Sequence, residues 1–363
     1  MNSQRKLQSI LVTGGCGFIG SNLIRSFFAK NDFRGTIVNL DALTYAGNRE
    51  SLLDIEEKYG NDRYTFVHGD INDSELLAET LNEYDIDTVI HLAAESHVDR
   101  SIEGPLEFIK TNILGTFTLL EAVRAYWKNR KDVLFHHVST DEVYGSLGET
   151  GLFSEDSPYD PRSPYSASKA GSDHLVSAYF HTYGIPVTIS NCSNNYGPFQ
   201  FPEKLLPLMI LNMSEGNSLP VYGDGQNVRD WVHVQDHNEG IWKIITSGLA
   251  GSTYNIGGGN EQTNIDVVQT LCKVYAEITG KEQSDVLSLI TYVKDRPGHD
   301  RRYAIDSTKI QEELGWNHSV SFEQGLRETV SWYLNNMEWI NRIRTGEYRD
   351  WIDKNYSERY HEL

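Results

Sequence analysis

The chain has 363 residues, of which 39% are hydrophobic and 23% charged, enough for one large domain or two modest domains with a substantial core. Its formal net charge of −19 argues against non-specific binding to nucleic acid or to a membrane surface. An anionic ligand would therefore have to be held by a local cluster of basic residues.

The sequence shows no apolar run of about 18 residues, so we expect no membrane span. The polar start, Met1 to Gln8, lacks the pattern of a secretory signal. Its three cysteines are scattered and form no CxxC pair, so we expect neither a disulfide framework nor a metal site. A reducing cytoplasm is the natural setting for such a chain.

The first half of the chain alternates short β-rich runs with helical patterns. Strands are expected at residues 9–13, 36–40, 64–68, 88–92, 133–138 and 187–191, and helices at 18–30, 74–84, 105–127 and 165–183. Strands that alternate with helices predict an α/β fold, a Rossmann-type doubly wound parallel sheet covered on both faces.

The regular alternation fades after about Asn194, where proline and glycine become frequent. Helical patterns return at 265–279, 308–314 and 322–335, which predicts a smaller mixed α/β C-terminal domain. Its role as the substrate-binding domain is implied by the family resemblance given below. We therefore expect domains at 1–193 and 194–363, with the chain crossing between them. Whether the aromatic and charged tail, 338–363, forms a further docked helix stays open.

A glycine-rich loop links the first expected strand to the first expected helix. Gly14, Gly17 and Gly20 give the spacing GxxGxxG, with Phe18 and Ile19 opening the helix. Such a loop gives a tight turn, a close backbone approach to a pyrophosphate, and close helix–strand packing. Glycines alone could mark a structural turn, but the strand–turn–helix context predicts a dinucleotide site.

Asp41 ends the second strand roughly 20 residues after the glycines, where an acid accepts from the ribose hydroxyls of NAD. A carboxylate there would repel a 2′-phosphate, which favours NAD over NADP. Taken alone, Asp41 could also be a turn-forming residue. Ligands bind along the strand ends of an open parallel sheet, and further cofactor contacts are expected at Asp70, Ile71, Leu92, Ala93 and Ala94.

Tyr165 and Lys169 lie four residues apart and share one helix face. A nearby ammonium can lower the pKa of a phenol, so Tyr165 could take a proton from an alcohol. Thr140, Asp141 and Glu142 stand upstream, where a strand should end. One base suffices for oxidation, so the acid pair indicates a second task in which a proton is removed and a hydroxyl expelled. The alternatives are an exposed YxxxK face and a solvated acidic loop.

Together these segments resemble the extended short-chain dehydrogenase/reductase family up to about Asn335, and within it the dTDP-glucose 4,6-dehydratases. The matching segments are 41–48, 93–101, 139–145, 191–198, 201–204, 223–225, 229–231 and 295–302. Segment 139–145 distinguishes the dehydratases from the related sugar-nucleotide 4-epimerases, which lack its Asp-Glu pair. Asn191 stands where many relatives carry Arg.

The resemblance implies a mechanism with recycled NAD. Tyr165, held as phenolate by Lys169 and the cofactor charge, takes the proton from the glucosyl O4 as hydride leaves C4, while Thr140 steadies O4. Glu142 then removes the C5 proton, and Asp141 protonates the departing C6 hydroxyl. Hydride returns to C6, which gives dTDP-4-keto-6-deoxy-glucose.

The resemblance also implies further contacts and an assembly. Additional cofactor contacts are Thr44, Thr111 and Asn195. Substrate contacts are Ser96, Thr140, Asn194, Lys204, Leu205, Pro220, Tyr222, Arg229, Asn264, Arg296 and His299, with Arg301 as a further candidate. A homodimer would form through the helices at 105–127 and 165–183, with Phe117, Leu120 and Val176 on or beneath the contact.

Two rival hypotheses stay open at this point. The first keeps the fold but changes the reaction, to a 4-epimerase or another nucleotide-sugar enzyme. The second is a non-catalytic NAD-binding regulatory protein. The nucleobase is the feature that the sequence determines least.

Overall fold

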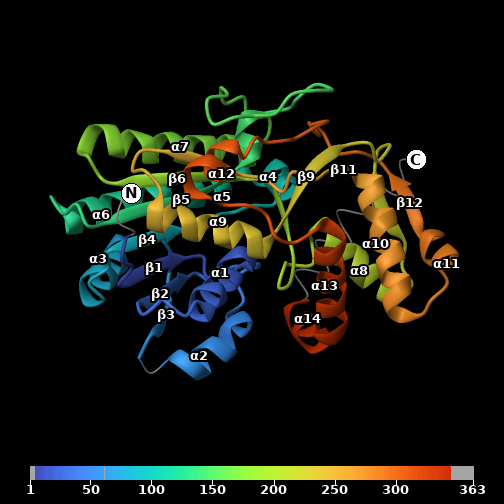
Figure 1. The fold of residues 1–363 in the computed structure, drawn as a ribbon, viewed down its shortest axis with the longest axis horizontal. Coiled ribbons are helices and arrows are strands. Elements are labelled where there is room, and N and C mark those ends of the chain that lie inside the picture. The colour runs from blue at the N-terminus through green and yellow to red at the C-terminus, as the bar shows by residue number, and fades with distance from the viewer. Residues whose placement is uncertain (1–4, 61, 345–363) are drawn as a thin grey trace.

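The computed structural model describes residues 5–60 and 62–344. Its largest element is a seven-stranded parallel sheet in the order β10-β6-β5-β4-β1-β2-β3 (Figure 1). The strands are β1 (Ser9–Thr13), β2 (Thr36–Asp41), β3 (Tyr64–His68), β4 (Thr88–His91), β5 (Leu134–Thr140), β6 (Val187–Cys192) and β10 (Thr253–Ile256). The predicted doubly wound parallel sheet is confirmed.

Helices cover both faces of this sheet. Successive side chains of a strand point to opposite faces, and β1 is buried at every position, so both faces need a covering layer. Ile10 and Val12 of β1 pack into one apolar cluster with helices α1 (Phe18–Ala29) and α9 (Val234–Ser247). Leu11 packs into the other cluster. The helices of that second face are α3 (Ser74–Glu83), α6 (Thr116–Trp127) and α7 (Pro164–Tyr183).

The expected helix at 105–127 is interrupted in its middle. Its parts are α5 (Pro105–Phe108), a π-helical segment (Ile109–Gly115) and α6. The π-helical segment carries Asn112, whose amide nitrogen donates to Ser168 Oγ of α7 at 2.8 Å and to the Glu95 carbonyl at 3.0 Å. Its amide oxygen accepts from the Glu95 N–H at 2.9 Å, so Asn112 joins this segment to α7 and to the loop after β4.

Other helices were not expected from the pattern. They are a 3₁₀ turn (Arg49–Leu52), α2 (Leu53–Tyr59), α4 (Val98–Glu103), α8 (Leu205–Glu215), α9, α11 (Gln283–Leu287) and α14 (Met337–Ile343). Most of them are short, and a short helix shows too few turns for a periodic pattern. Helix α14 begins the expected tail; the rest of the tail, from 345, lies outside the described residues.

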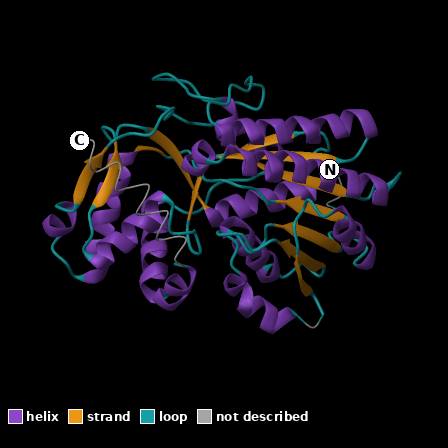
Figure 2. Ribbon diagram, turned by 180° about the vertical axis from the view of Figure 1, so that it is seen from behind, coloured by secondary structure: helices purple, strands orange, loops and turns teal. Residues whose placement is uncertain are grey.

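The C-terminal part has an apolar cluster of its own, apart from the large sheet (Figure 2). Strands β7 (Asn194–Tyr196), β9 (Val228–His233) and β11 (Glu261–Thr263) form one small sheet, and β8 (Leu219–Tyr222) and β12 (Ile290–Val293) form another. The helices against them are α8, α10 (Asn264–Thr279), α11, α13 (Phe322–Asn335) and α14.

After residue 194 the chain returns to the large sheet. Strand β10 pairs with the edge strand β6, and α9 packs on α1, with α12 (Thr308–Leu314) beside both β10 and α9. The division into 1–193 and 194–363 stays a prediction about folding units. None of the described helices is long and apolar enough to cross a membrane.

We expect Asp236→Ala to destabilise the protein. The carboxylate of Asp236, buried at the start of α9, accepts from Ser319 N (3.0 Å), Ser319 Oγ (2.7 Å) and Val320 N (3.0 Å). Its loss would leave the backbone N–H groups of Ser319 and Val320 without this charged acceptor, at a cost of roughly 1–3 kcal/mol of unfolding free energy. Denaturant titration measures this. The control Asp54→Ala breaks an exposed pair with Arg25 and should cost about 0.5 kcal/mol; equal costs would contradict the prediction.

Candidate active site

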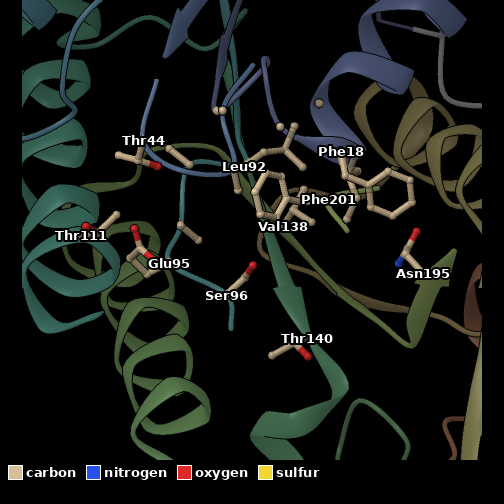
Figure 3. A pocket seen from close by; sticks show the side chains of 18 of the residues that line it. Phe18, Thr44, Leu92, Glu95, Ser96, Thr111, Val138, Thr140, Asn195 and Phe201 are labelled. Atoms are coloured by element: carbon tan, nitrogen blue, oxygen red, sulfur yellow. The ribbon is translucent and has the colours of Figure 1, made fainter. Parts of the chain in front are cut away.

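A cavity lies at the carboxyl edge of the large sheet (Figure 3). Its walls come from the ends of β1, β2, β4, β5 and β6, from α1 and α7, and from the segment 193–204. The structure brings every residue that we expected to bind cofactor or to act in catalysis to this cavity. They are Gly14, Gly17, Phe18, Ile19, Gly20, Asp41, Thr44, Asp70, Ile71, Leu92, Ala93, Ala94, Thr111, Thr140, Asp141, Glu142, Tyr165, Lys169 and Asn195.

The glycine loop is as tight as its sequence indicates. Gly14 has φ +72°, and a Cβ on it would lie 2.7 Å from the backbone of Ala93. A Cβ on Gly20 would lie 2.4 Å from the Gly14 carbonyl oxygen. The loop leads into the N-terminus of α1, whose N-cap, Gly17, has no side chain to hold the first amides. Those amides and the helix dipole suit a pyrophosphate.

Asp41 connects the end of β2 to this loop. Its Oδ2 accepts from the backbone N–H of Cys16 and its Oδ1 from that of Leu43, both at 2.8 Å. Burial raises the pKa of Asp41, and the two N–H donors oppose that shift. Each oxygen keeps a second lone pair, so the carboxylate can still accept from a ribose hydroxyl.

A short 3₁₀ turn, Asp141–Tyr144, follows β5 and sets the two acids in place. Thr140 is its N-cap: Thr140 Oγ1 accepts from the Glu142 N–H at 3.3 Å and donates to Asp141 Oδ1 at 3.4 Å. The turn holds Asp141 and Glu142 beside the cavity with different surroundings.

The two acids differ in their electrostatics. Burial, and then the charge of Glu142, raise the pKa of Asp141 well above that of an ordinary carboxyl. Burial also raises the pKa of Glu142, but the positive charges of Arg296, Arg229 and Lys204 counteract it. The two carboxyl groups therefore have different electrostatic surroundings, with more of the nearby positive charge acting on Glu142 than on Asp141.

Helix α7 presents Tyr165 and Lys169. It begins with a capping box between Ser163 and Ser166 and with Pro164 at its first position. Lys169 Nζ donates to the Val138 carbonyl of β5 at 2.9 Å. This anchors α7 to the strand that carries the acids.

The surroundings of Tyr165 within the protein raise its pKa. Burial raises the pKa of Tyr165 well above 10, the charge of Glu142 adds to the rise, and the hydrogen bond with Thr140 opposes it. Burial also lowers the pKa of Lys169. Desolvation thus opposes the charged form of each group, and the phenolate that the resemblance implies depends on the charge of the cofactor as well as on Lys169.

Sequence reasoning missed a polar cluster beneath Lys169. Asp173 accepts from Ser139 Oγ at 2.8 Å and from Tyr159 Oη at 3.0 Å, and lies 3.1 Å from His137 Nε2. His137 Nε2 is in turn 3.4 Å from Lys169 Nζ. The one available signal was that Asp173 follows Lys169 by four residues, on the same helix face.

The expected substrate contacts fall into two groups. Ser96, Thr140, Asn194 and Lys204 line the cavity, and Lys204 Nζ donates to the Ser96 carbonyl at 2.9 Å. Seven others lie outside its lining and belong to the C-terminal part: Leu205, Pro220, Tyr222, Arg229, Asn264, Arg296 and His299.

The two arginines of that second group act on the site through charge. Arg229 is buried, donates to the Val228 and Asp300 carbonyls, and lies over the Tyr303 ring. Arg296 lies 3.6 Å from the Asp99 carboxylate. Arg301 is instead exposed and paired with Asp224, away from the cavity.

The cavity also has walls that the sequence did not single out. Phe201 and Glu95 both line it, and Figure 3 shows Glu95 on the side of Thr44 and Thr111. Glu203 is buried and paired with Arg100 at 3.0 Å. Glu95 and Glu203 belong to segments already noted for their resemblance, which was the available signal.

Comparison with known proteins places the chain in a family. A family model described as GDP-mannose 4,6 dehydratase matches residues 11–329. The chain belongs to this family. Individual relatives are also named as 4,6-dehydratases. The chain is 53% identical to dTDP-glucose 4,6-dehydratase 1 of Escherichia coli strain K12, over 96% of this chain and 99% of that protein. It is 53% identical to the dTDP-glucose 4,6-dehydratase of Neisseria meningitidis serogroup B, over 94% and 98%.

Solved structures agree with this membership. The dTDP-glucose 4,6-dehydratase of Bacillus anthracis, described in complex with NAD, is 46% identical with a TM-score of 0.83, over 93% of this chain and 99% of that chain. A UDP-glucose 4-epimerase from Thermotoga maritima is 30% identical with a TM-score of 0.79, over 91% and 100%. The resemblance to the extended short-chain dehydrogenase/reductase family is confirmed.

We expect the protein to prefer NAD to NADP by roughly 100-fold or more, because a carboxylate beside a 2′-phosphate costs several kcal/mol. Asp41→Asn should lower the ratio of NAD affinity to NADP affinity, because it weakens NAD binding and removes the repulsion of the 2′-phosphate. Calorimetric titration of both dinucleotides measures it. Glu95→Gln, which changes a carboxylate elsewhere in the cavity, should leave the ratio unaltered; an equal effect of both variants would contradict the role of Asp41.

Proposed function

We propose that the protein is a dTDP-glucose 4,6-dehydratase, a hydro-lyase that converts dTDP-glucose to dTDP-4-keto-6-deoxy-glucose in the cytoplasm. One observation carries the proposal: a buried acid pair, Asp141 and Glu142, stands at the end of β5 in the same cavity as Tyr165 and the dinucleotide loop. The names of the 53%-identical relatives support the choice of substrate.

Oxidation at C4 falls to Tyr165. When bound, NAD supplies a hydride acceptor and a positive ring, which is the additional charge that the phenolate of Tyr165 needs. Tyr165 accepts the O4 proton, Thr140 donates a hydrogen bond toward O4, and Lys169, fixed on the Val138 carbonyl, holds positive charge behind the pair. The resulting 4-ketone makes the C5 proton acidic.

Elimination falls to the acid pair. Glu142, kept ionisable by Arg229, Arg296 and Lys204, removes the C5 proton. Asp141, protonated because of its burial and the charge of Glu142, gives its proton to the C6 oxygen, which leaves as water.

The same three basic residues would neutralise the diphosphate, which the acidic chain could not do otherwise. Arginine suits phosphate because its planar guanidinium donates two parallel hydrogen bonds. The remaining contacts that we propose for the substrate are Ser96, Asn194, Leu205, Pro220, Tyr222, Asn264 and His299.

Incubation with dTDP-, UDP-, GDP- and CDP-glucose tests the function, with products analysed by mass. We expect loss of water, fastest with dTDP-glucose. A 4-epimerase would give a product of unchanged mass, and a regulatory protein no product. The acid pair argues against both alternatives, because neither an epimerase nor a regulatory protein expels a hydroxyl.

The two acids should fail at different steps from Tyr165. Asp141→Asn cannot protonate the leaving hydroxyl and Glu142→Gln cannot accept the C5 proton, so each should lose dehydration by roughly 100- to 10,000-fold while 4-keto-glucose accumulates. Only Asp141→Asn should keep exchange of the C5 hydrogen with heavy water. Rapid quenching and mass analysis of the sugar measure both effects.

Tyr165→Phe is the matched control, because it should abolish oxidation and therefore form no keto sugar at all, while still binding NAD. Dehydration at the native rate by the two acid variants would contradict the assignment of Asp141 as the acid and Glu142 as the base.

We further propose a homodimer. Leu106, Ile109, Leu114 and Phe117 are each 40–59% exposed along α5, the π-helical segment and α6, whereas Leu120 and Val176 lie buried beneath. Exposed apolar side chains gathered on one element are typical of an interface between subunits.

Phe117→Arg should weaken the dimer, because a charge placed in a buried contact loses its hydration. Sedimentation should show a dimer for the native chain and a monomer for the variant at micromolar concentration. Leu249→Arg changes an exposed leucine away from these helices and should leave the dimer intact. A native monomer would refute the proposal.

A further inference from the structure

The proposed reaction leaves two residues with the wrong number of protons. The sugar loses the hydrogen of O4 and the hydroxyl of C6, which together make one water. Tyr165 ends the turnover holding the O4 proton, and Asp141 ends it without the proton that left with the C6 oxygen. The C5 proton returns to carbon and does not enter this balance. Before the next turnover, one proton has to leave Tyr165 and one has to reach Asp141.

The hydroxyl of Thr140 lies between these two groups. Its Oγ1 is 3.4 Å from Asp141 Oδ1, to which it donates, and it is also hydrogen-bonded to the phenol of Tyr165. Its third contact is the Glu142 backbone N–H, at 3.3 Å. A hydroxyl has one donor and two acceptor positions. Thr140 can thus accept from Tyr165 and Glu142 N–H while donating to Asp141.

The two oxygens of Asp141 have different surroundings. Oδ1 faces Thr140, whereas Oδ2 is buried and has no hydrogen-bond partner among the described residues. An oxygen held without a partner inside the site is available for the C6 hydroxyl. One oxygen can therefore receive the proton, and the other can deliver it after a half-turn of the carboxyl group.

We propose that Thr140 returns the proton from Tyr165 to Asp141 within the closed site, an inference that rests on the proposed dehydratase function. The O–H bond of Tyr165 breaks as Thr140 Oγ1 takes its proton, and the original O–H bond of Thr140 breaks as Asp141 Oδ1 takes the second proton. Thr140 keeps one proton throughout. Tyr165 becomes phenolate, Asp141 becomes carboxylic acid, and no redox change or co-reactant is involved.

Burial favours this internal route over exchange with solvent. Thr140, Asp141 and Tyr165 are only 8%, 2% and 8% exposed. Because both transfers share one hydroxyl, Thr140 never has to carry a net charge.

The test compares the first turnover with later ones. Thr140→Val keeps the shape of the side chain but removes the hydroxyl, and Thr140→Ser keeps the hydroxyl. Thr140→Val also loses the contact of the hydroxyl with O4, which should slow every turnover alike, whereas the reset is needed only after the first. Thr140→Val should therefore form about one product per site, more slowly than the native chain, and then slow by a further factor of roughly 100, as expected for loss of a proton-transfer group. Rapid quenching with excess dTDP-glucose measures both phases.

The slow phase of Thr140→Val should quicken as imidazole buffer is raised, because a small acid–base pair can then carry the proton. Thr140→Ser should show no slow phase. Equal slowing of first and later turnovers would overturn the proposal, since it would leave Thr140 only its contact with O4. A slow phase indifferent to buffer would also overturn it, since product release would then be limiting.

A second measurement uses the native chain and does not depend on either variant. In weak buffer with a pH indicator, a single turnover should show no transient release of protons. Release of up to one proton per site would overturn the internal route. Failure of the dehydratase function itself would look different, because the native chain would then release no water from the sugar at all.

Discussion

The pairing of β5 with its two neighbours is the constraint on which the site depends. Parallel pairing places Thr140, the last residue of β5, opposite Cys192 of β6, and His137 opposite His91 of β4. Because the strands run the same way, their carboxyl ends open at one edge, and the loops that follow all face one cavity. A one-residue slip of β5 would turn Thr140 to the other face of the sheet and separate the acid pair from Tyr165.

Desolvation then gives each group its chemical role. Burial raises the pKa values of both Asp141 and Glu142. The charges of Arg296, Arg229 and Lys204 oppose the rise at Glu142, whereas of these three only Arg229 opposes it at Asp141. The large sheet thus supplies the reacting groups, and the smaller part supplies the charge that differentiates them. Neither part could catalyse the elimination without the other, which explains why the chain crosses between them.

The sequence predicted the large sheet well because its signals are local. Buried strands such as Ser9–Thr13, the glycine loop and the YxxxK spacing each lie within about twenty residues. The return of β10 to the sheet and the docking of α9 on α1 depend on contacts across the whole chain, and no local pattern records them. The π-helical segment and the raised pKa of Tyr165 were missed for the same reason: the hydrogen bonds of Asn112 and the desolvation of Tyr165 come from neighbours remote in sequence.

The π-helical segment also determines in which direction the side chains before and after it point. In an α-helix, residues five apart point in clearly different directions, whereas i→i+5 hydrogen bonding brings such residues nearly into line. Ile109 and Leu114 are five apart, and Leu106 and Phe117 continue the series at steps of three. The wide turn therefore rotates the second half of the helix relative to the first. These four apolar side chains stay exposed together, while Asn112 points inward. Deleting one residue here would restore a regular helix, yet it would rotate one half of this surface away from the other.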